Sequence, residues 1–507
     1  MSGAEHLRVA GNCPVSPALR IGTSPEERSR VVQVLPDDRS PVLVEVDLAR
    51  DPSTEQTRQD FLGVFRQTFG LSPDPPPDPR PVAAGYLACL LSPPEVQQLV
   101  AEDRGPDGQG PHTVFRVWPD YTLTAHIDRS VSTIKADAVL RAYAATGEGV
   151  VWAVLDSGID AGHPHFAGGT LTGRVERLHH DFTSLVPPYP EKPEDLPLED
   201  PAGHGTHVAG IIAGRLSETC DPVIGSLETV ADGLPSWTAR RLGPGRTLAG
   251  MAPMAQLVSL KVLAERGGEL VTSSSAVIEA LYYVRETLNT GGRLLLVHGV
   301  NLSFGCPWDP RDYACGQSPL CREVNLLVAS GVVVVVSAGN GGFGGAALPG
   351  EGTSDARAVL ATITDPGNAD AAITVGSTHR DRPHEFGVTY SSSKGPTLDG
   401  RLKPDLLAPG EHITSCATGG LRAQLAALLP AGGDPDGLPT YVEESGTSMA
   451  APHVSGAIAA FLSARQEYIG RPREVKQLFC DNATSLGRDH YLEGHGLVDL
   501  MRVMSNV

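Results

Sequence analysis

Runs of valine and leucine alternate with helical segments from Gly149 onward, and this pattern limits the fold more than any other feature of the chain. The segments are, in order, VVWAVLDSG, HGTHVAGIIAG, QLVSLKVLA, SSAVIEALYYVRETL, RLLLVHGVNLS and GVVVVVSAGN. Near-continuous apolar strands separated by helices are typical of a parallel sheet that is buried on both faces. We therefore predict an α/β domain with a doubly wound, mostly parallel sheet, in which ligands bind at the carboxyl ends of the strands.

The chain before this domain predicts two further regions. Residues 1–40 are polar without sustained periodicity, and we expect an irregular lead-in. Residues 41–128 follow the order β-α-β-α-β, which predicts a small α+β domain, and 129–507 then form the large domain. The expected elements of the small domain are a strand from Pro41, a helix capped by Ser53, a strand over 82–91, a helix from Pro93 to about Ala101 and a strand over 113–118.

Charge and hydropathy exclude some partners. The 40 basic and 59 acidic residues give a formal charge of -19, which repels nucleic acid and anionic membrane surfaces. The longest uncharged apolar run, Gly331 to Gly342, is shorter than the ~20 residues that span a bilayer. We expect neither nucleic acid nor a membrane as partner.

The cellular compartment is predicted from the first residues and the cysteines. The start MSGAEHLRVAGNCPVSPALR lacks the basic region and apolar run of a secretory signal, and the eight cysteines include no CxxC pair. This indicates reduced thiols and a cytoplasmic protein. A secreted protein is the alternative.

Three segments place chemically competent side chains at the ends of predicted elements. AVLDSGID ends a strand with Asp156, DPAGHGTHVAGIIAG presents His204 just before a helix, and ESGTSMAAPHVSGAIAAFLSA puts Ser448 at a helix start. A serine hydroxyl needs a base to take its proton, and that base needs a carboxylate to fix its tautomer. Asp, His and Ser supply these parts, so we predict nucleophilic catalysis.

These segments resemble a known family. DSGID, GHGTHVAG and GTSMAAPHVSG are similar to the three signature motifs of the subtilisin-like serine proteases, the subtilases, and the resemblance runs from about Val131 to Leu500. It implies a serine endopeptidase that cleaves extended polypeptides through an acyl-enzyme. Ser448 would attack, His204 would move the proton, and Asp156 would orient His204.

The resemblance also implies further site residues. Asn340, in SAGN, matches the family's asparagine that donates to the oxyanion. Ser303, Phe304 and Gly305, in NLSFG, match the segment that pairs with the substrate backbone and lines the pocket for the residue before the cleaved bond. Many family members have a smaller residue at Phe304, so the side-chain preference stays open.

The small domain resembles the family's inhibitory propeptide, in AAGYLACLLSPPEVQQLV and VFRVWPD. This implies a domain that assists folding and restrains the protease until the chain is cut between about Asp120 and Lys135. Two alternatives stay open: a catalytically silent protein plugged by this domain, and a trigger-released protease dedicated to one protein partner. The oligomeric state is not predicted.

No cofactor is expected to be required. An acidic insertion between Gly214 and Leu248 stands where many subtilisins carry a short calcium-binding loop, so calcium is possible but unsupported, and no metal site is predicted. We interpret a further set of potential ligands as loop or packing residues: Asp221, Glu228, Asp232, Cys306, Cys315, Cys321, His163, His165, His179, His180, His207 and His453.

Overall fold

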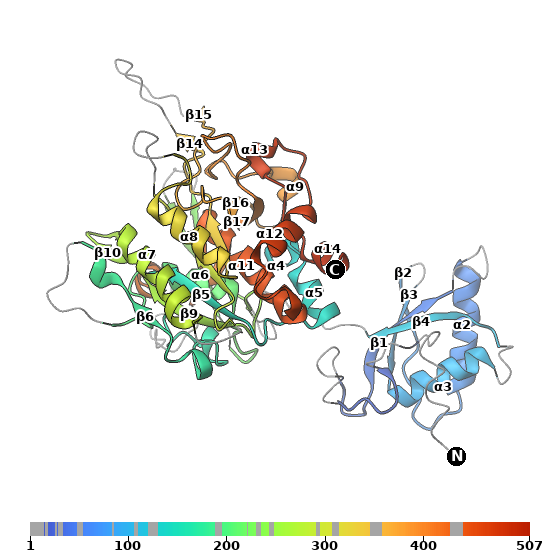
Figure 1. The fold of residues 1–507 in the computed structure, drawn as a ribbon. Coiled ribbons are helices and arrows are strands. Elements are labelled where there is room, and N and C mark those ends of the chain that lie inside the picture. The colour runs from blue at the N-terminus through green and yellow to red at the C-terminus, as the bar shows by residue number, and fades with distance from the viewer. Residues whose placement is uncertain are drawn as a thin grey trace. The chain divides into compact units, whose positions relative to one another are not determined.

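The computed structural model divides into two compact units, residues 1–123 and 124–507 (Figure 1). The described residues are 15, 19–25, 28, 34–47, 54–83, 86–105, 110–119, 130–187, 195–220, 222–229, 235–242, 248–290, 295–306, 314–344, 357–425 and 440–507.

The N-terminal unit is an antiparallel sheet packed against two helices. Its strands lie in the order β2-β3-β1-β4. The elements are β1 (Ser40–Val46), α2 (Thr54–Phe69), β2 (Arg80–Ala83), β3 (Tyr86–Leu91), α3 (Pro93–Arg104) and β4 (Val114–Pro119). Phe61, Phe65 and Leu99 of the helices are buried in one core with Val42 and Leu87 of the sheet.

Two details of this unit differ from the sequence-based expectation. The single strand predicted over 82–91 is two strands, β2 and β3, which pair antiparallel with each other. Part of the lead-in also belongs to the core, because Val15 and Leu19 are buried and Val15 forms a parallel bridge with Val117. Most of the lead-in lies outside the described residues.

The C-terminal unit is built on a seven-stranded sheet in which every neighbouring pair is parallel, with the order β17-β16-β13-β12-β5-β9-β6. Its strands are β5 (Val151–Asp156), β6 (His180–Asp181), β9 (Gln256–Lys261), β12 (Gly299–Leu302), β13 (Val333–Ser337), β16 (Ile373–His379) and β17 (Leu406–Glu411). The predicted doubly wound, mostly parallel sheet is confirmed.

Helices cover both faces of this sheet (Figure 1). Trp152 and Val154 point into a core shared with α5 (Ala136–Tyr143), α6 (His204–Ile212), α11 (Thr447–Ala464), α12 (Pro472–Asp481) and α14 (Leu500–Ser505). Alternate residues of β5 point into a second core, with α7 (Ser274–Tyr282) and α8 (Pro319–Ala329). Gly299 makes room for Trp152, since a Cβ there would lie 2.2 Å from the indole.

A smaller sheet, β18-β19-β7-β8, lies in the same unit. Its strands are β18 (Ile413–Cys416), β19 (Thr440–Glu444), β7 (Val223–Thr229) and β8 (Pro235–Arg241). The insertion between Gly214 and Leu248, whose acidic residues we interpret from sequence as loop or packing residues, contains two antiparallel strands, β7 and β8, and β7 pairs in parallel with β19. VIGSLET and PSWTARR contain the β-branched and aromatic residues that favour strands, which explains the difference.

Shorter elements complete the unit: α4 (Ser130–Thr133), β10 (Ala264–Arg266), β11 (Glu269–Val271), the π-helical η5 (Tyr283–Leu288), β14 (Phe343–Gly344), β15 (Arg357–Ala358), α9 (Pro383–Phe386), α10 (Gly419–Leu425) and α13 (His490–Glu493). Across the described ranges, no helix has the length and apolar character needed to cross a membrane.

Candidate active site

The sheet order places a crevice between β5 and β12. From β5 the chain proceeds to β6 and β9 on one side, whereas β12 and the later strands lie on the other side. A parallel sheet opens a ligand-binding crevice at the carboxyl ends of the two strands where this order reverses. Asp156 is the last residue of β5, and Ser303 directly follows β12.

The N-terminus of α11 reaches the same crevice. The Ser448 hydroxyl donates a hydrogen bond to the carbonyl oxygen of Ser303 at 2.8 Å, and the Ser303 hydroxyl donates to the carbonyl oxygen of Ser448 at 2.9 Å. These reciprocal bonds hold the predicted nucleophile next to the predicted substrate-pairing segment. Within the described part of the chain, no hydrogen bond joins Ser448 to His204.

Asp156 and His204 form a close pair. His204 Nδ1 lies 2.7 Å from Oδ1 of Asp156, and the Asp156 side chain is 1% exposed while that of His204 is 25% exposed. With the Nδ1 proton directed at the carboxylate, Nε2 carries the lone pair that can accept a proton. Gly205 permits this approach of α6 to β5, because a Cβ there would lie 2.2 Å from the Gly158 oxygen.

Asn340 presents its amide nitrogen to the space beside Ser448. Its Oδ1 accepts hydrogen bonds from the Thr447 backbone N–H at 3.0 Å and the Thr447 hydroxyl at 3.1 Å. A Cβ on Gly446 would lie 3.4 Å from Asn340 Nδ2 and 3.8 Å from the Ser448 backbone nitrogen. The Asn340 side chain and the Ser448 backbone nitrogen, the two donors that the sequence motifs predict for an oxyanion site, therefore both lie close to Gly446.

A buried carboxylate that sequence reasoning missed orders this region. Asp200 accepts from the Ser157 hydroxyl and the Gly203 N–H through Oδ1, and from the Thr206 N–H and hydroxyl through Oδ2, all within 2.9 Å. Ser157 in turn accepts from the Gly205 N–H. Asp200 thus joins the end of β5 to the first turn of α6. The sequence contained one signal for Asp200, because it is an acidic residue just before a predicted helix and aspartate is among the residues preferred at helix N-termini.

The charges around His204 determine its protonation. Burial lowers the pKa of His204, but the attraction of Asp156 and the hydrogen bond to it, with smaller contributions from Asp200 and Glu444, outweigh burial and raise the pKa to about 9. Burial also raises the pKa of Glu444, while His204 lowers it. A base must be neutral to accept a proton, so His204 becomes competent only as pH rises towards this value.

This electrostatic arrangement predicts a shift in the pH profile. We expect kcat/KM to fall about tenfold per pH unit below the His204 pKa. Because Glu444→Gln removes one carboxylate that raises this pKa, the acidic limb should move to lower pH. Glu443→Gln is the control, since Glu443 pairs with Arg380 and Arg240 instead. If the acidic limbs of both variants coincide with that of the wild type, Glu444 does not raise the pKa of His204.

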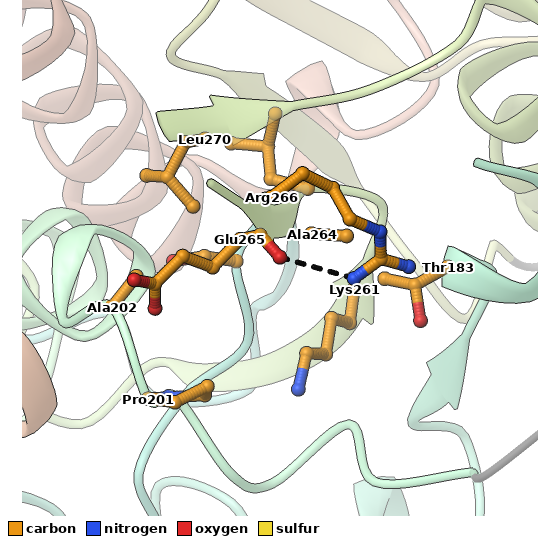
Figure 2. Close-up of a pocket in the computed structure, with 10 residues that line it drawn as sticks. Thr183, Pro201, Ala202, Lys261, Ala264, Glu265, Arg266 and Leu270 are labelled. Carbon is orange, nitrogen blue, oxygen red and sulfur yellow. Dashed lines mark hydrogen bonds between the residues drawn. The ribbon is translucent and has the colours of Figure 1, made fainter. Parts of the chain in front are cut away.

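Two adjoining pockets lie beside the end of β5 and the segment that follows β12. The first, of about 170 Å³, is lined by Ser157, Pro201 and Ala202 and by the β10–β11 hairpin. Figure 2 shows the side chains of Glu265 and Arg266 extending to opposite sides of it, towards Ala202 and Thr183.

The second pocket, of about 270 Å³, is lined by Phe304 and Gly305 and shares Leu263 and Leu270 with the first. The second pocket thus adjoins the predicted substrate-pairing segment. Thr364, which had no local signal in the sequence, lies behind that segment: a Cβ on Gly305 would lie 2.3 Å from its hydroxyl oxygen.

The other potential ligands do not assemble. His163, His165 and His179 bond to backbone or hydroxyl oxygens, as do His207 and His453. Among the residues that the structure describes, no group of three or more His, Cys, Asp or Glu side chains could hold a metal, and each cysteine is free. Asp221, Asp232 and the Glu228 side chain lie outside what is described.

Comparison with known proteins agrees with this geometry. The profile of the subtilase family matches residues 147–497. The chain belongs to the subtilase family. It is therefore a serine endopeptidase, as the sequence motifs predicted.

Individual relatives resemble this subtilase over most of its length. An intracellular serine protease of Paenibacillus polymyxa is 29% identical over 74% of this chain and 86% of its own length. Subtilisin E of Bacillus subtilis is 29% identical over 73% of this chain and 69% of its own, and the serine protease AprX of the same organism is 28% identical over 74% and 70%.

Proposed function

We propose that this subtilase cleaves extended polypeptides through an acyl-enzyme formed on Ser448. His204 accepts the proton of the Ser448 hydroxyl through Nε2 and passes it to the leaving amine, while Asp156 holds the imidazole and stabilises its charged form. Asn340 Nδ2 and the Ser448 N–H stabilise the oxyanion of the tetrahedral intermediate. Water then hydrolyses the ester by the same steps.

One observation carries this proposal: Asp156 orients the His204 imidazole, while Asn340 is bonded to Thr447, the first residue of α11 and the neighbour of Ser448. The 2.7 Å contact between Asp156 and His204 and the position of Asn340 Nδ2 beside Gly446 support the assigned roles. In this arrangement Ser448 must turn from the Ser303 carbonyl towards His204 when substrate binds. Catalytic hydrogen bonds commonly tighten only in the substrate complex.

The test combines casein hydrolysis with active-site labelling. We expect the purified protein to cleave casein, and a serine-directed fluorophosphonate to abolish cleavage while adding one label that peptide mapping assigns to Ser448. Label on a different serine, or cleavage that survives complete labelling, would refute the mechanism.

Substitution of Asn340 tests the oxyanion site. Asn340→Ala removes one of two donors, so we expect kcat to fall by about 100- to 1,000-fold with little change in KM, a magnitude known from subtilisin. Steady-state kinetics on a chromogenic peptide would measure the change. Asn289→Ala serves as the control because its amide bonds to Val297, away from the residues assigned to the site. A loss below about threefold in Asn340→Ala would remove Asn340 from the mechanism.

Two pockets support the choice of extended polypeptides as substrates. They share Leu263 and Leu270, and their lining extends from Ser157, next to Asp156, to Phe304 and Gly305. A chain lying along them would pair its backbone with the segment 303–305 and place successive side chains in the two pockets. The wall of the second pocket is largely apolar, which favours apolar side chains there. Cleavage of a peptide library, read by mass spectrometry, would define the preference.

We propose that the N-terminal domain, predicted over 41–128, restrains the protease until the chain is cut between about Asp120 and Lys135. Its antiparallel sheet with two helices is consistent with a propeptide-like domain. Intact mass measured over time should show loss of about 120–135 residues together with a rise in casein cleavage. A full-length, inert wild type would favour the two alternatives, a catalytically silent protein plugged by this domain or a trigger-released protease.

We also propose a cytoplasmic location. A relative is named an intracellular serine protease, and the free cysteines at the described positions fit a reducing compartment. Immunoblots of cell and medium fractions should find the protein in the cells. Its presence in the medium alone would favour the secreted alternative.

A further inference from the structure

The loop that carries Asn340 is held by a buried lysine from a distant part of the chain. Lys394 is 5% exposed. Its Nζ donates to the carbonyl oxygen of Gly342 at 2.9 Å, two residues beyond Asn340. It also donates to the carbonyl oxygens of Tyr390 at 2.9 Å and Ser392 at 3.0 Å. Lys394 therefore ties the loop of Asn340 to its own segment and uses all three ammonium protons to do so.

Lys394 forms no ion pair with any carboxylate in the described ranges, which is unusual for a buried charge. Lys403 shows the usual arrangement, because its ammonium is buried and lies 2.7 Å from the Asp405 carboxylate. Burial lowers the pKa of Lys394. Burying a cation without a counter-ion costs free energy, whereas bonds from a charged donor are short and strong. Because Lys394 donates these bonds only to backbone oxygens, it fixes the position of the backbone at those residues.

The same two segments are joined on both sides of Asn340. The Ser393 N–H donates to the Gly339 oxygen at 2.9 Å, and the Ser393 hydroxyl accepts from the Gly341 N–H at 3.1 Å. The Gly342 N–H donates to the Ser391 oxygen at 2.9 Å. The loop of Asn340 consists of residues 339–342, and its other three residues are glycines. Glycine restricts the backbone least, so the loop depends on these bonds to the segment of Lys394 for its position.

We propose that Lys394 is a positioning residue for Asn340: its bond to Gly342 fixes the loop so that the Asn340 amide stays aimed at the space beside the Ser448 N–H. This inference rests on the proposed role of Asn340 in stabilising the oxyanion. A donor displaced by about 1 Å can cost about 100-fold in rate, so a loop with glycines on either side of the donor needs such a restraint.

The test is a double-mutant cycle between Lys394 and Asn340. Lys394→Met keeps an unbranched apolar stem but removes the ammonium. We expect kcat to fall about 10- to 30-fold while KM changes less than about twofold, because the lost interaction acts on the transition state. In the Asn340→Ala background, the same substitution should change kcat by less than about twofold, since no amide remains to be positioned.

Two further variants distinguish a change in the position of Asn340 from a general loss of protein stability. Lys476→Met is the control: Lys476 also donates to backbone oxygens, those of Asp370 and Ala372, and in addition pairs with the Asp405 carboxylate at 2.9 Å, so this variant should lower the melting temperature without lowering kcat. If Lys394→Met does not fold, Ser393→Ala removes the bond to the Gly341 N–H instead and should lower kcat about threefold with the same dependence on Asn340.

The outcomes are distinguishable. A wild-type kcat in folded Lys394→Met, or an equal loss with and without Asn340, would overturn the positioning role while leaving the serine protease mechanism in place. Absence of fluorophosphonate-sensitive hydrolysis in wild type that has lost its N-terminal domain would overturn the proposed mechanism itself. A loss confined to the Asn340-containing background would support the inference.

Discussion

Replacing Ser448 with alanine is expected to lower kcat by about 10⁵- to 10⁶-fold and to leave the fold intact. The magnitude follows from subtilisin, in which removal of the nucleophile costs about 10⁶-fold in kcat. The substitution removes one hydroxyl, whose hydrogen bond goes to the Ser303 carbonyl. Burst-phase and steady-state assays with a chromogenic peptide would measure the loss.

The same variant also tests self-processing. If Ser448 cleaves the chain between the two predicted domains, Ser448→Ala should remain full length while the wild type shortens. Ser463→Ala is a control on the same helix, because Ser463 lies near the opposite end of α11 and its hydroxyl bonds to the Ala460 carbonyl oxygen and the Gly147 N–H. Shortening of Ser448→Ala in a purified preparation would mean that another protease does the cutting.

Replacing Asp156 with asparagine is expected to lower kcat by about 10⁴-fold at neutral pH, the loss known for an equivalent substitution in a serine protease triad. The amide of asparagine can donate to Nδ1, which favours the tautomer with its proton on Nε2, and His204 then cannot accept the proton of Ser448. The loss of the carboxylate also removes the attraction that raises the pKa of His204. A pH profile of kcat/KM should therefore show both the loss and an acidic limb at lower pH.

A second carboxylate provides the comparison for this variant. Asp200→Asn changes a buried group that bonds to Ser157, Gly203 and Thr206 but not to the imidazole. We expect a smaller loss of kcat than in Asp156→Asn, with a lower melting temperature because buried hydrogen bonds are lost. Equal losses in the two variants would contradict the separate role assigned to Asp156.

The parallel sheet and the motifs could be predicted because both have local signatures. A doubly buried strand contains almost only apolar residues, as in β5 and β13, and each of Asp156, His204 and Ser448 lies at a strand end or helix start that the adjoining segment identifies. Strand pairing is less local. The strand expected over 82–91 is split because Arg80 pairs antiparallel with Ala88, and Gly85 is the one break signal within the apolar run.

Asp200 and Lys394 could not be assigned from sequence for a related reason. The partners of Asp200 include Ser157, at the end of another element, and one partner of Lys394 is the carbonyl oxygen of Gly342, 52 positions away. A backbone oxygen has no side-chain signature, so a residue that binds one leaves no pattern in the sequence. Thr364, behind Gly305, is likewise recognised only from the close approach of two separate segments.

The position of Ser448 in the fold also bears on when activity can appear during folding. Its helix follows β19, and β19 is parallel to β7, a strand from more than 200 residues earlier in the chain. Contacts between residues so distant in sequence form late, because closing a long loop costs entropy before the contact stabilises anything. Asp156 and His204 can come together while the chain is still incomplete, but the nucleophile joins them only after nearly the whole domain has been made. A nascent chain of this protein is thus inert towards itself and its neighbours until its last large helix docks.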